Sequence, residues 1–169
     1  MAMFLDVQNP PIAGESTSTN PNWNNKIEVD NMSFGVHVPT SMQRGKGLMA
    51  AGSKVGSLSV TKTMDASTPI LWYYLAAGLP IDQMTIRVNS PGAKGGPQGG
   101  LFESETKELH NVIVSSYQTS GSAGTGGLPT EQWTFAFTQV KLTTQAVDAQ
   151  GNKLPPKSKG FDFGGGAPL

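Results

Sequence analysis

Most of the chain alternates apolar and polar residues with the two-residue period that is typical of a β-strand. In residues 83–89, one face of the expected strand carries Met84, Ile86 and Val88. Residues 131–142 repeat the pattern with aromatic side chains on one face, at Trp133, Phe135 and Phe137. Further runs bring the expected total to about seven strands, at residues 3–7, 26–38 (with a β-bulge expected near Asn31) and 101–117. The pattern therefore predicts a mainly β protein with a buried aromatic face.

The run at residues 101–117 departs from simple alternation. In an extended strand Leu109 and Ile113 would point one way, while Val112 and Val114 would point the other. The second half of this strand would then be apolar on both faces. We therefore expect Val112 and Val114 to contribute to an interface between subunits.

One stretch, residues 61–78, predicts a helix at about residues 68–77, which follows a strand ending at Val60. Its start is marked by side chains that can accept hydrogen bonds from the first-turn N–H groups and by a proline at a tolerated position, namely Asp65, Ser67, Thr68 and Pro69. Gly78 and Pro80 end it. The stripe expected to face a sheet consists of Ile70, Leu71, Tyr74 and Leu75. Aromatic residues on a short helix more often pack in the core or form an interface than stack on bases or sugars. Trp72 and Tyr73 are therefore expected at a subunit interface.

These elements predict a small β-barrel of two packed sheets, or a sandwich, with one flanking α-helix. The length of 169 residues fits one domain over residues 1–169, and the tail at residues 155–169, rich in proline and glycine, is expected to stay mobile. Residues 39–56 form a connection longer than most loops in compact domains, which suggests a function. The candidate contact residues in this loop are Arg44, Gly45, Lys46, Gly47 and Met49.

Composition narrows the classes of function. Twelve basic and twelve acidic residues cancel, and 14% of residues are charged, so no broad field exists to attract nucleic acid or an acidic membrane surface. The chain has no cysteine, which excludes disulfides, thiolate catalysis and sulfur-ligated metals. The start of the chain lacks the pattern of a cleaved signal peptide, and no apolar run is long enough to cross a membrane.

The chemistry-bearing residues form no catalytic motif, and no cofactor is expected. The only two histidines, His37 and His110, lack ligand spacing, so a metal site would need both to converge with carboxylates such as Asp30 or Glu108. Glu103, Glu105 and Lys107 alternate, and the favoured interpretation is one solvated strand face with ion partners across strands. The Gly-Lys-Gly sequence at residues 45–47 lacks the leading glycine and the serine or threonine of a phosphate-binding loop.

The order of several motifs resembles the haemolysin-coregulated protein (Hcp) family, the tube component of type VI secretion, which is related to the tail-tube proteins of contractile phages. An Ile-x-Gly-Glu-Ser motif occurs at residues 12–16, and Phe34-Gly35 is similar to the family's aromatic–glycine pair. The family's Lys-x-x-Asp-x-x-Ser-Pro-x-Leu signature is matched by Lys62, Asp65, Pro69 and Leu71, with Thr68 in place of serine. Similarities continue along nearly the whole chain with Leu109, Val112, Val114, the Ser-Ser-Tyr at residues 115–117, Glu131, and the Gly-Phe-Asp at residues 160–162.

The resemblance implies a β-barrel subunit of a homohexameric ring, with rings stacked into a tube inside a contractile sheath. It also implies that the loop at residues 39–56, with the candidate residues named above, reaches an adjacent subunit or ring. Implied partners are further copies of the chain, the sheath, the baseplate, a VgrG-type spike protein and secreted effectors carried in the lumen. The protein would stay in the bacterial cytoplasm until firing and then leave the cell without a cleaved signal peptide. Strand faces that are rich in serine and threonine and weakly charged would let unrelated cargo pass through the lumen.

Alternative functions remain open on the sequence. The chain resembles tail-tube proteins of other contractile, phage-like particles as well. A small β-barrel that binds carbohydrate or another ligand through Trp72, Tyr73 and neighbouring loops is a second class of function. A hydrolase with an unrecognised polar site is a third, and the lack of a catalytic motif argues against it.

Overall fold

The computed structural model describes residues 1–50, 55–94, 100–124 and 126–169. It confirms a mainly β chain with one helix, α1 (Thr68–Ala77). Its strands are β1 (Ala2–Asn9), β2 (Pro11–Ile12), β3 (Ile27–Val29), β4 (Asn31–His37), β5 (Thr40–Gln43), β6 (Gly47–Ala50), β7 (Val55–Thr63), β8 (Pro80–Pro91), β9 (Leu101–Ser120), β10 (Thr130–Thr144), β11 (Lys157–Asp162) and β12 (Ala167–Pro168).

Strand pairing builds one large sheet, in the order β12-β11-β10-β9-β8-β1-β2, and a separate hairpin of β5 and β6. Three further strands belong to the same sheet but lie off this path: β7 pairs with β10, β4 pairs with β7, and β3 pairs with β1. The prediction of a small closed β-barrel is not confirmed among the described strands. The strands β3 and β4 are consecutive along the chain, separated only by Asp30, but β3 pairs with β1 and β4 pairs with β7. At this point the two parts of the sheet are joined by the covalent chain, whereas a closed barrel would need hydrogen-bonded strands there.

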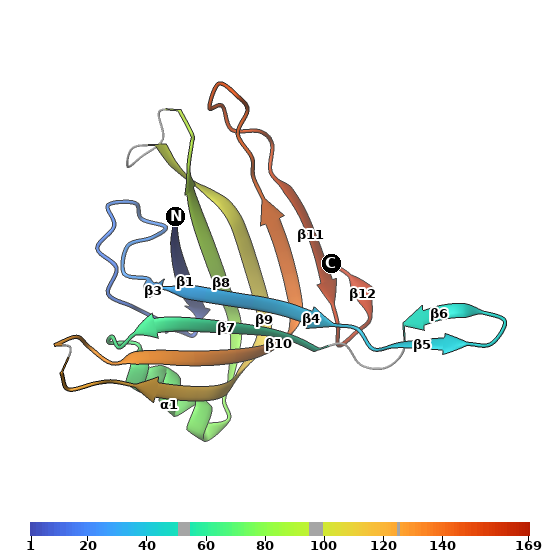
Figure 1. Cartoon of the computed structure of the whole chain (residues 1–169), viewed down its shortest axis with the longest axis horizontal. Helices are drawn as coiled ribbons and strands as arrows, with labels where there is room; N and C mark the ends of the chain where they lie inside the picture. Colours follow the sequence, from blue (N-terminus) through green and yellow to red (C-terminus); the bar gives the residue numbers. More distant parts are fainter. Residues whose placement is uncertain (51–54, 95–99, 125) are drawn as a thin grey trace.

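The long strands β9 and β10 belong to two layers of this sheet (Figure 1). The first half of β10 pairs with β7, and its second half, after Thr138, pairs with β11. Opposite this point on β9 lies Asn111, whose φ of 58° is in the left-handed region that asparagine tolerates better than most residues. The strands change direction at this pair, and the apolar faces of the two layers are turned toward each other.

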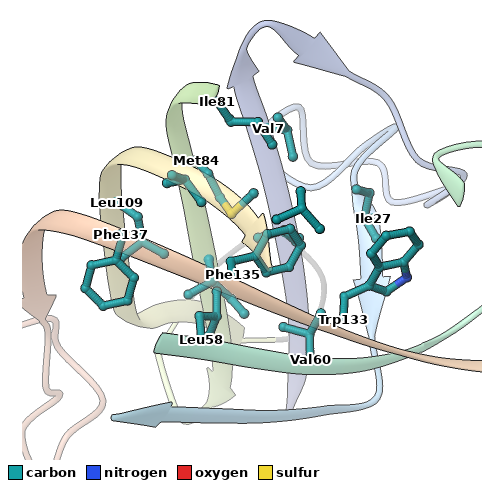
Figure 2. Close-up of a cluster of buried hydrophobic side chains, with 14 of the residues drawn as sticks. Val7, Ile27, Leu58, Val60, Ile81, Met84, Leu109, Trp133, Phe135 and Phe137 are labelled. Carbon is teal, nitrogen blue, oxygen red and sulfur yellow. The ribbon is translucent and has the colours of Figure 1, made fainter. Parts of the chain in front are cut away.

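The core lies between these layers (Figure 2). The expected aromatic face is confirmed, since Trp133, Phe135 and Phe137 are each at most 2% exposed. The expected apolar face of residues 83–89 is also confirmed by buried Met84 and Ile86. At Gly56, which is paired with Phe137, an added Cβ would lie 2.2 Å from an atom of the phenylalanine ring. The core therefore requires glycine at this position of β7.

The prediction that β9 is apolar on both faces is wrong. Leu109, Val112 and Val114 all face the core and are at most 2% exposed, whereas Ile113 points outward and is 39% exposed. The positive φ of Asn111 reverses the alternation between Leu109 and Val112. Val112 and Val114 are therefore core residues of a single chain, which corrects their assignment to a subunit interface.

Three other local predictions also change. A β-bulge was expected near Asn31, but the chain there passes from β3, which pairs with β1, to β4, which pairs with β7. The shift in the apolar pattern therefore marks the boundary between two strands. The connection at residues 39–56 contains the β5–β6 hairpin, while residues 51–54 lie outside the described residues. The tail was expected to be mobile, but β11 pairs with β10 over six residues.

The predicted range of the helix, residues 68–77, is confirmed. It ends at Gly78, whose φ is 65° and whose N–H donates to the carbonyl oxygen of Leu75. Leu71 is fully buried, and Tyr74 and Leu75 pack against the core. Ile70 is 43% exposed, so its assignment to the buried stripe is wrong.

Candidate functional site

The helix-start residues form part of a buried polar cluster around Lys62. The Lys62 ammonium lies 2.9 Å from Asp65 Oδ1 and 3.1 Å from Glu131 Oε2. It also lies 3.1 Å from the carbonyl oxygen of Thr63 and 3.3 Å from Thr68 Oγ1. The side chains of Lys62 and Glu131 are fully buried, so this is an ion pair inside the protein.

Glu131 accepts hydrogen bonds on both carboxylate oxygens. Its Oε2 accepts from Thr68 Oγ1 at 2.9 Å and from Trp133 Nε1 at 3.1 Å, in addition to Lys62. Its Oε1 accepts from the Tyr117 hydroxyl at 3.3 Å. A buried carboxylate is stable when its oxygens are satisfied in this way. The cluster thereby joins β7, β9, β10 and the first residue of α1.

The predicted capping role of the helix-start signature is corrected by this geometry. The N-cap residue Ser67 makes no side-chain hydrogen bond to the first turn. Asp65 Oδ1 instead accepts from the Ser67 backbone N–H at 2.9 Å and from the Ser67 hydroxyl at 2.5 Å, while the Thr68 hydroxyl donates to Glu131. Pro69 does occupy the tolerated position at the start of the helix. The helix-start residues therefore attach α1 to β7 and β10 through side-chain hydrogen bonds and ion pairs, and the role of the Lys62 cluster is to stabilise the fold.

Sequence reasoning related Lys62 and Glu131 to the family motifs but did not predict that they meet. A signal for this was present in the alternation. Lys62 is in phase with the buried Leu58 and Val60, and Glu131 is in phase with Trp133 and Phe135. A charged residue in phase with an apolar face requires a buried partner of opposite charge, and these two residues are direct register partners.

The outer face of α1 carries an exposed apolar surface. Trp72 is 53% exposed and Tyr73 is 58% exposed, and Ile70 lies one turn from Tyr73. The core cluster does not include any of these three side chains. This position is compatible with the predicted interface role of Trp72 and Tyr73, which stays a prediction.

The β5–β6 hairpin is a second exposed surface, and it projects from the body beyond the end of β4 (Figure 1). Its turn holds Arg44, Gly45 and Lys46, all exposed, and φ is 83° at Gly45 and 77° at Gly47. Met42 and Leu48 are register partners, so they share one face of the hairpin, and they are 82% and 69% exposed. Met49 lies in β6 opposite Ser41.

A third surface is the outward face of the layer formed by β4, β7, β10 and β9, of which two neighbouring rows are polar and uncharged. One row across these strands consists of Asn31, Thr61, Gln132 and Gln118. The next row consists of Ser33, Ser59, Thr134 and Ser116. This agrees with the expected face rich in serine and threonine.

The expected solvated face of Glu103, Glu105 and Lys107 is wrong. The pairing between β8 and β9 skips Ser104, so Glu103 and Glu105 fall on opposite faces of β9. Glu103 pairs with Arg87 on the outer face at 3.3 Å. Lys107 is 5% exposed, lies 2.6 Å from Glu105, and its ammonium is 5.5 Å from the centre of the Phe34 ring.

Two features are absent from the described residues. Across the described parts of the chain, no group of three or more histidine, cysteine, aspartate or glutamate side chains is placed to hold a metal ion. None of the helices in the described part has the length and apolar character that crossing a membrane requires.

Comparisons with known proteins agree with this architecture. The chain is 33% identical to Protein hcp1 of Pseudomonas aeruginosa over 99 residues, which are 59% of this chain and 57% of that protein. The chain thus aligns with just over half the length of this curated relative. A solved structure of a type six secretion system protein superposes with a TM-score of 0.82 over 99% of both chains, at 21% identity. Hcp1 from Salmonella typhimurium gives a TM-score of 0.70 over 99% of this chain and 98% of that one, at 24% identity.

The two structural matches show the same fold. The family follows from the sequence, because the family model described as "Type VI secretion system effector, Hcp" matches residues 4–143, which extend from β1 to β10. The chain therefore belongs to the Hcp family of type VI secretion proteins.

Proposed function

We propose that the chain is the structural subunit of a type VI secretion inner tube, in which homohexameric rings stack and are expelled by contraction of a sheath. The observation that carries this proposal is the family match over residues 4–143. The partners in this proposal are further copies of the chain, the sheath, the baseplate and the VgrG-type spike. The protein stays in the cytoplasm until firing and then leaves the cell.

The exposed face of α1 supports association between copies. Trp72 and Tyr73 are more than half exposed, although the core is formed without them. Large aromatic side chains are enriched where protein surfaces meet. In the ring these two side chains would contact the neighbouring subunit, and the charge-poor sequence offers little electrostatic repulsion against this.

The uncharged outward face of β4, β7, β10 and β9 supports the lumen assignment. Its two rows contain only serine, threonine, asparagine and glutamine side chains. Ser59 and Thr134 hydrogen-bond to each other at 3.2 Å, so part of this polar capacity is satisfied within the face. These two rows have neither charge nor a large apolar side chain with which to retain cargo, and the next row adds one exposed apolar side chain, Ile113 (39% exposed). Effectors in the lumen would therefore be released after delivery.

The test is the oligomeric state of the purified chain, measured by light scattering after size-exclusion chromatography and by electron microscopy. We expect six-membered rings. The variant Trp72→Ser/Tyr73→Ser should raise the protein concentration needed for ring formation by roughly tenfold or more, because the interface between subunits would bury less apolar surface. The matched control is Leu154→Ser, which removes an exposed apolar side chain (44% exposed) from another part of the surface.

A strict monomer at high concentration would refute the ring. The exposed Trp72 and Tyr73 also fit the alternative of a carbohydrate-binding module, in which aromatic rings stack on sugars. A dispersed protein that binds in a glycan array, and loses this binding in the Trp72→Ser/Tyr73→Ser variant, would favour that alternative.

A further inference from the structure

The outward face of β1, β8 and the first half of β9 holds a second buried cluster, apart from the core between the two layers. Arg87 and Asn89 follow one another on this face of β8, and Asn89 is the register partner of Ala2 on β1 and of Glu103 on β9. Glu103 Oε2 lies 3.3 Å from Arg87 Nη1. The side chains of Arg87, Asn89 and Glu103 are therefore neighbours on the face that points away from the core.

A loop covers this cluster from outside. The connection between β2 and β3, residues 13–26, contains no helix or strand and lies beside β1 (Figure 1). Trp23 in this loop is 2% exposed, and its ring stacks on Phe4 with 6.1 Å between the ring centroids. The indole Nε1 donates a hydrogen bond to Glu103 Oε1 at 3.1 Å. The Trp23 loop, as we call residues 13–26, thus attaches to both β1 and β9.

Asn89 is exceptional in this cluster because its polar atoms have no protein partner. The residue is fully buried, and neither Oδ1 nor Nδ2 forms a hydrogen bond with a described residue. Turning the amide over would exchange the two atoms and leave both without a partner. Arg87 Nε is also buried and also makes no hydrogen bond to a described residue. One acceptor atom and two donor atoms are therefore gathered on this face without a protein partner.

The surroundings of Asn89 define the class of molecule that could satisfy these atoms. Two basic and two acidic side chains of the cluster compensate one another, because Lys26 lies 2.8 Å from Asp6 and Arg87 lies 3.3 Å from Glu103. The cluster therefore has no excess charge with which to hold an ion. Full burial of Asn89 excludes a large molecule. The ligand must be small and uncharged, and it must both donate and accept hydrogen bonds, as water does.

We propose that a buried water site lies beneath the Trp23 loop, in which water accepts hydrogen bonds from Asn89 Nδ2 and Arg87 Nε and donates to Asn89 Oδ1. Buried water typically makes about three hydrogen bonds to polar groups that the protein leaves unsatisfied. Ala2, the partner of Asn89 on β1, has a small side chain that fills little of the space beside the amide. The site belongs to the fold of a single copy and is independent of the proposed tube function.

The proposal reverses the expected contribution of Asn89 to stability. A buried amide without hydrogen bonds would destabilise the fold, and an apolar side chain of similar shape would then be better. Hydrogen bonds through a bound water are nearly as favourable as direct ones. With water in place, Asn89 stabilises this face of the sheet, and an apolar replacement is worse.

A crystal structure of the natural chain, at a resolution that shows ordered water, is the direct test. We expect water oxygens about 2.7–3.2 Å from the Asn89 amide atoms and from Arg87 Nε, with Trp23 buried above them. An Asn89 amide that is bonded only to protein groups, or to none, overturns the proposal. In the Asn89→Ser variant an additional water should replace the removed amide group, and a dry, collapsed site there overturns the proposal as well.

The sign of a stability change is an independent test. Leucine has the branched shape of asparagine without its polar atoms. If water satisfies Asn89, the Asn89→Leu variant loses these hydrogen bonds, and its melting temperature should fall by about 2–8 °C. A rise in melting temperature would show that the amide is buried without partners, and it would overturn the proposal.

The matched control is Asn24→Leu, which makes the same replacement at an exposed position of the Trp23 loop. Its melting temperature should stay within about 2 °C of that of the natural chain. A fall in the control as large as the fall in Asn89→Leu would assign the effect to the leucine itself and overturn this line of support. If Asn89→Leu does not fold, the crystal structure of the natural chain decides the question by itself.

Discussion

Replacing Lys62 by methionine should be among the most destabilising single changes in this chain. The ammonium and the Glu131 carboxylate are both fully buried and lie 3.1 Å apart. Methionine keeps most of the volume of the lysine side chain but leaves Glu131 and Asp65 as two carboxylates without a cation. Removing one partner of a buried ion pair costs about 3–5 kcal/mol, because the remaining charge is uncompensated.

The assay is thermal unfolding, followed by circular dichroism at neutral pH and at one fixed protein concentration, since assembly adds to apparent stability. At about 2–4 °C per kcal/mol for a domain of this size, the melting temperature should fall by about 6–20 °C. The variant Glu131→Gln alone should also destabilise, because Lys62 then keeps only Asp65 as a counter-charge.

The double variant Lys62→Met/Glu131→Gln separates the ion pair from other effects. Glutamine keeps an oxygen that can accept from Thr68 and Trp133, so the double variant should lose less stability than the sum of the two single variants. The matched control is Lys26→Met, which breaks the pair between Lys26 (side chain 26% exposed) and Asp6, while Arg87 stays 3.7 Å from Asp6 as a counter-charge, so the change should cost about 0–1 kcal/mol. A Lys62→Met effect as small as the control, or strict additivity, would refute the reasoning.

Three further outcomes follow from single positions. Gly56→Ala should destabilise by about 1–3 kcal/mol in chemical denaturation, because the new methyl group overlaps the aromatic ring paired with it, whereas Gly35→Ala has no heavy atom within 4 Å and should stay within about 0.5 kcal/mol. Asn111→Val should cost about 1–2 kcal/mol in the same assay because φ is 58° there, and Asn111→Gly should not. A hydrogen bond from the backbone N–H of Asn152 lowers the pKa of Asp148 below 3.8. The ionised carboxylate therefore stabilises the turn above pH 3.8, and this contribution is lost as the pH falls through the lowered pKa. The amide NMR shift of Asn152 should follow this titration, and the titration should be absent in Asp148→Ala.

The candidate surfaces could be predicted from the sequence to different extents. Trp72 and Tyr73 were assigned to an interface because aromatic residues on a short helix often pack or form interfaces, and both are exposed. The helical period correctly placed Leu71 in the core, but it also put the exposed Ile70 in the buried stripe. The hairpin was expected as a long connection with a function, but its strands were not, since Thr40–Gln43 and Gly47–Ala50 lack a clear alternation of apolar and polar residues. The buried pair of Lys62 and Glu131 needed knowledge of strand register, although the phase of each residue already indicated the core.

The sequence by itself determined the mainly β class, the range of α1, the aromatic face of β10 and the family, because side-chain period and motif order are local properties of the chain. Only the tertiary structure decided that Val112 and Val114 face inward, since a single left-handed residue, Asn111, reverses the alternation at the bend. It also decided that strand pairing does not close a barrel and that Lys62 and Glu131 meet as a buried ion pair. Register, bends and the separation of distant residues depend on contacts between segments, which no local pattern encodes.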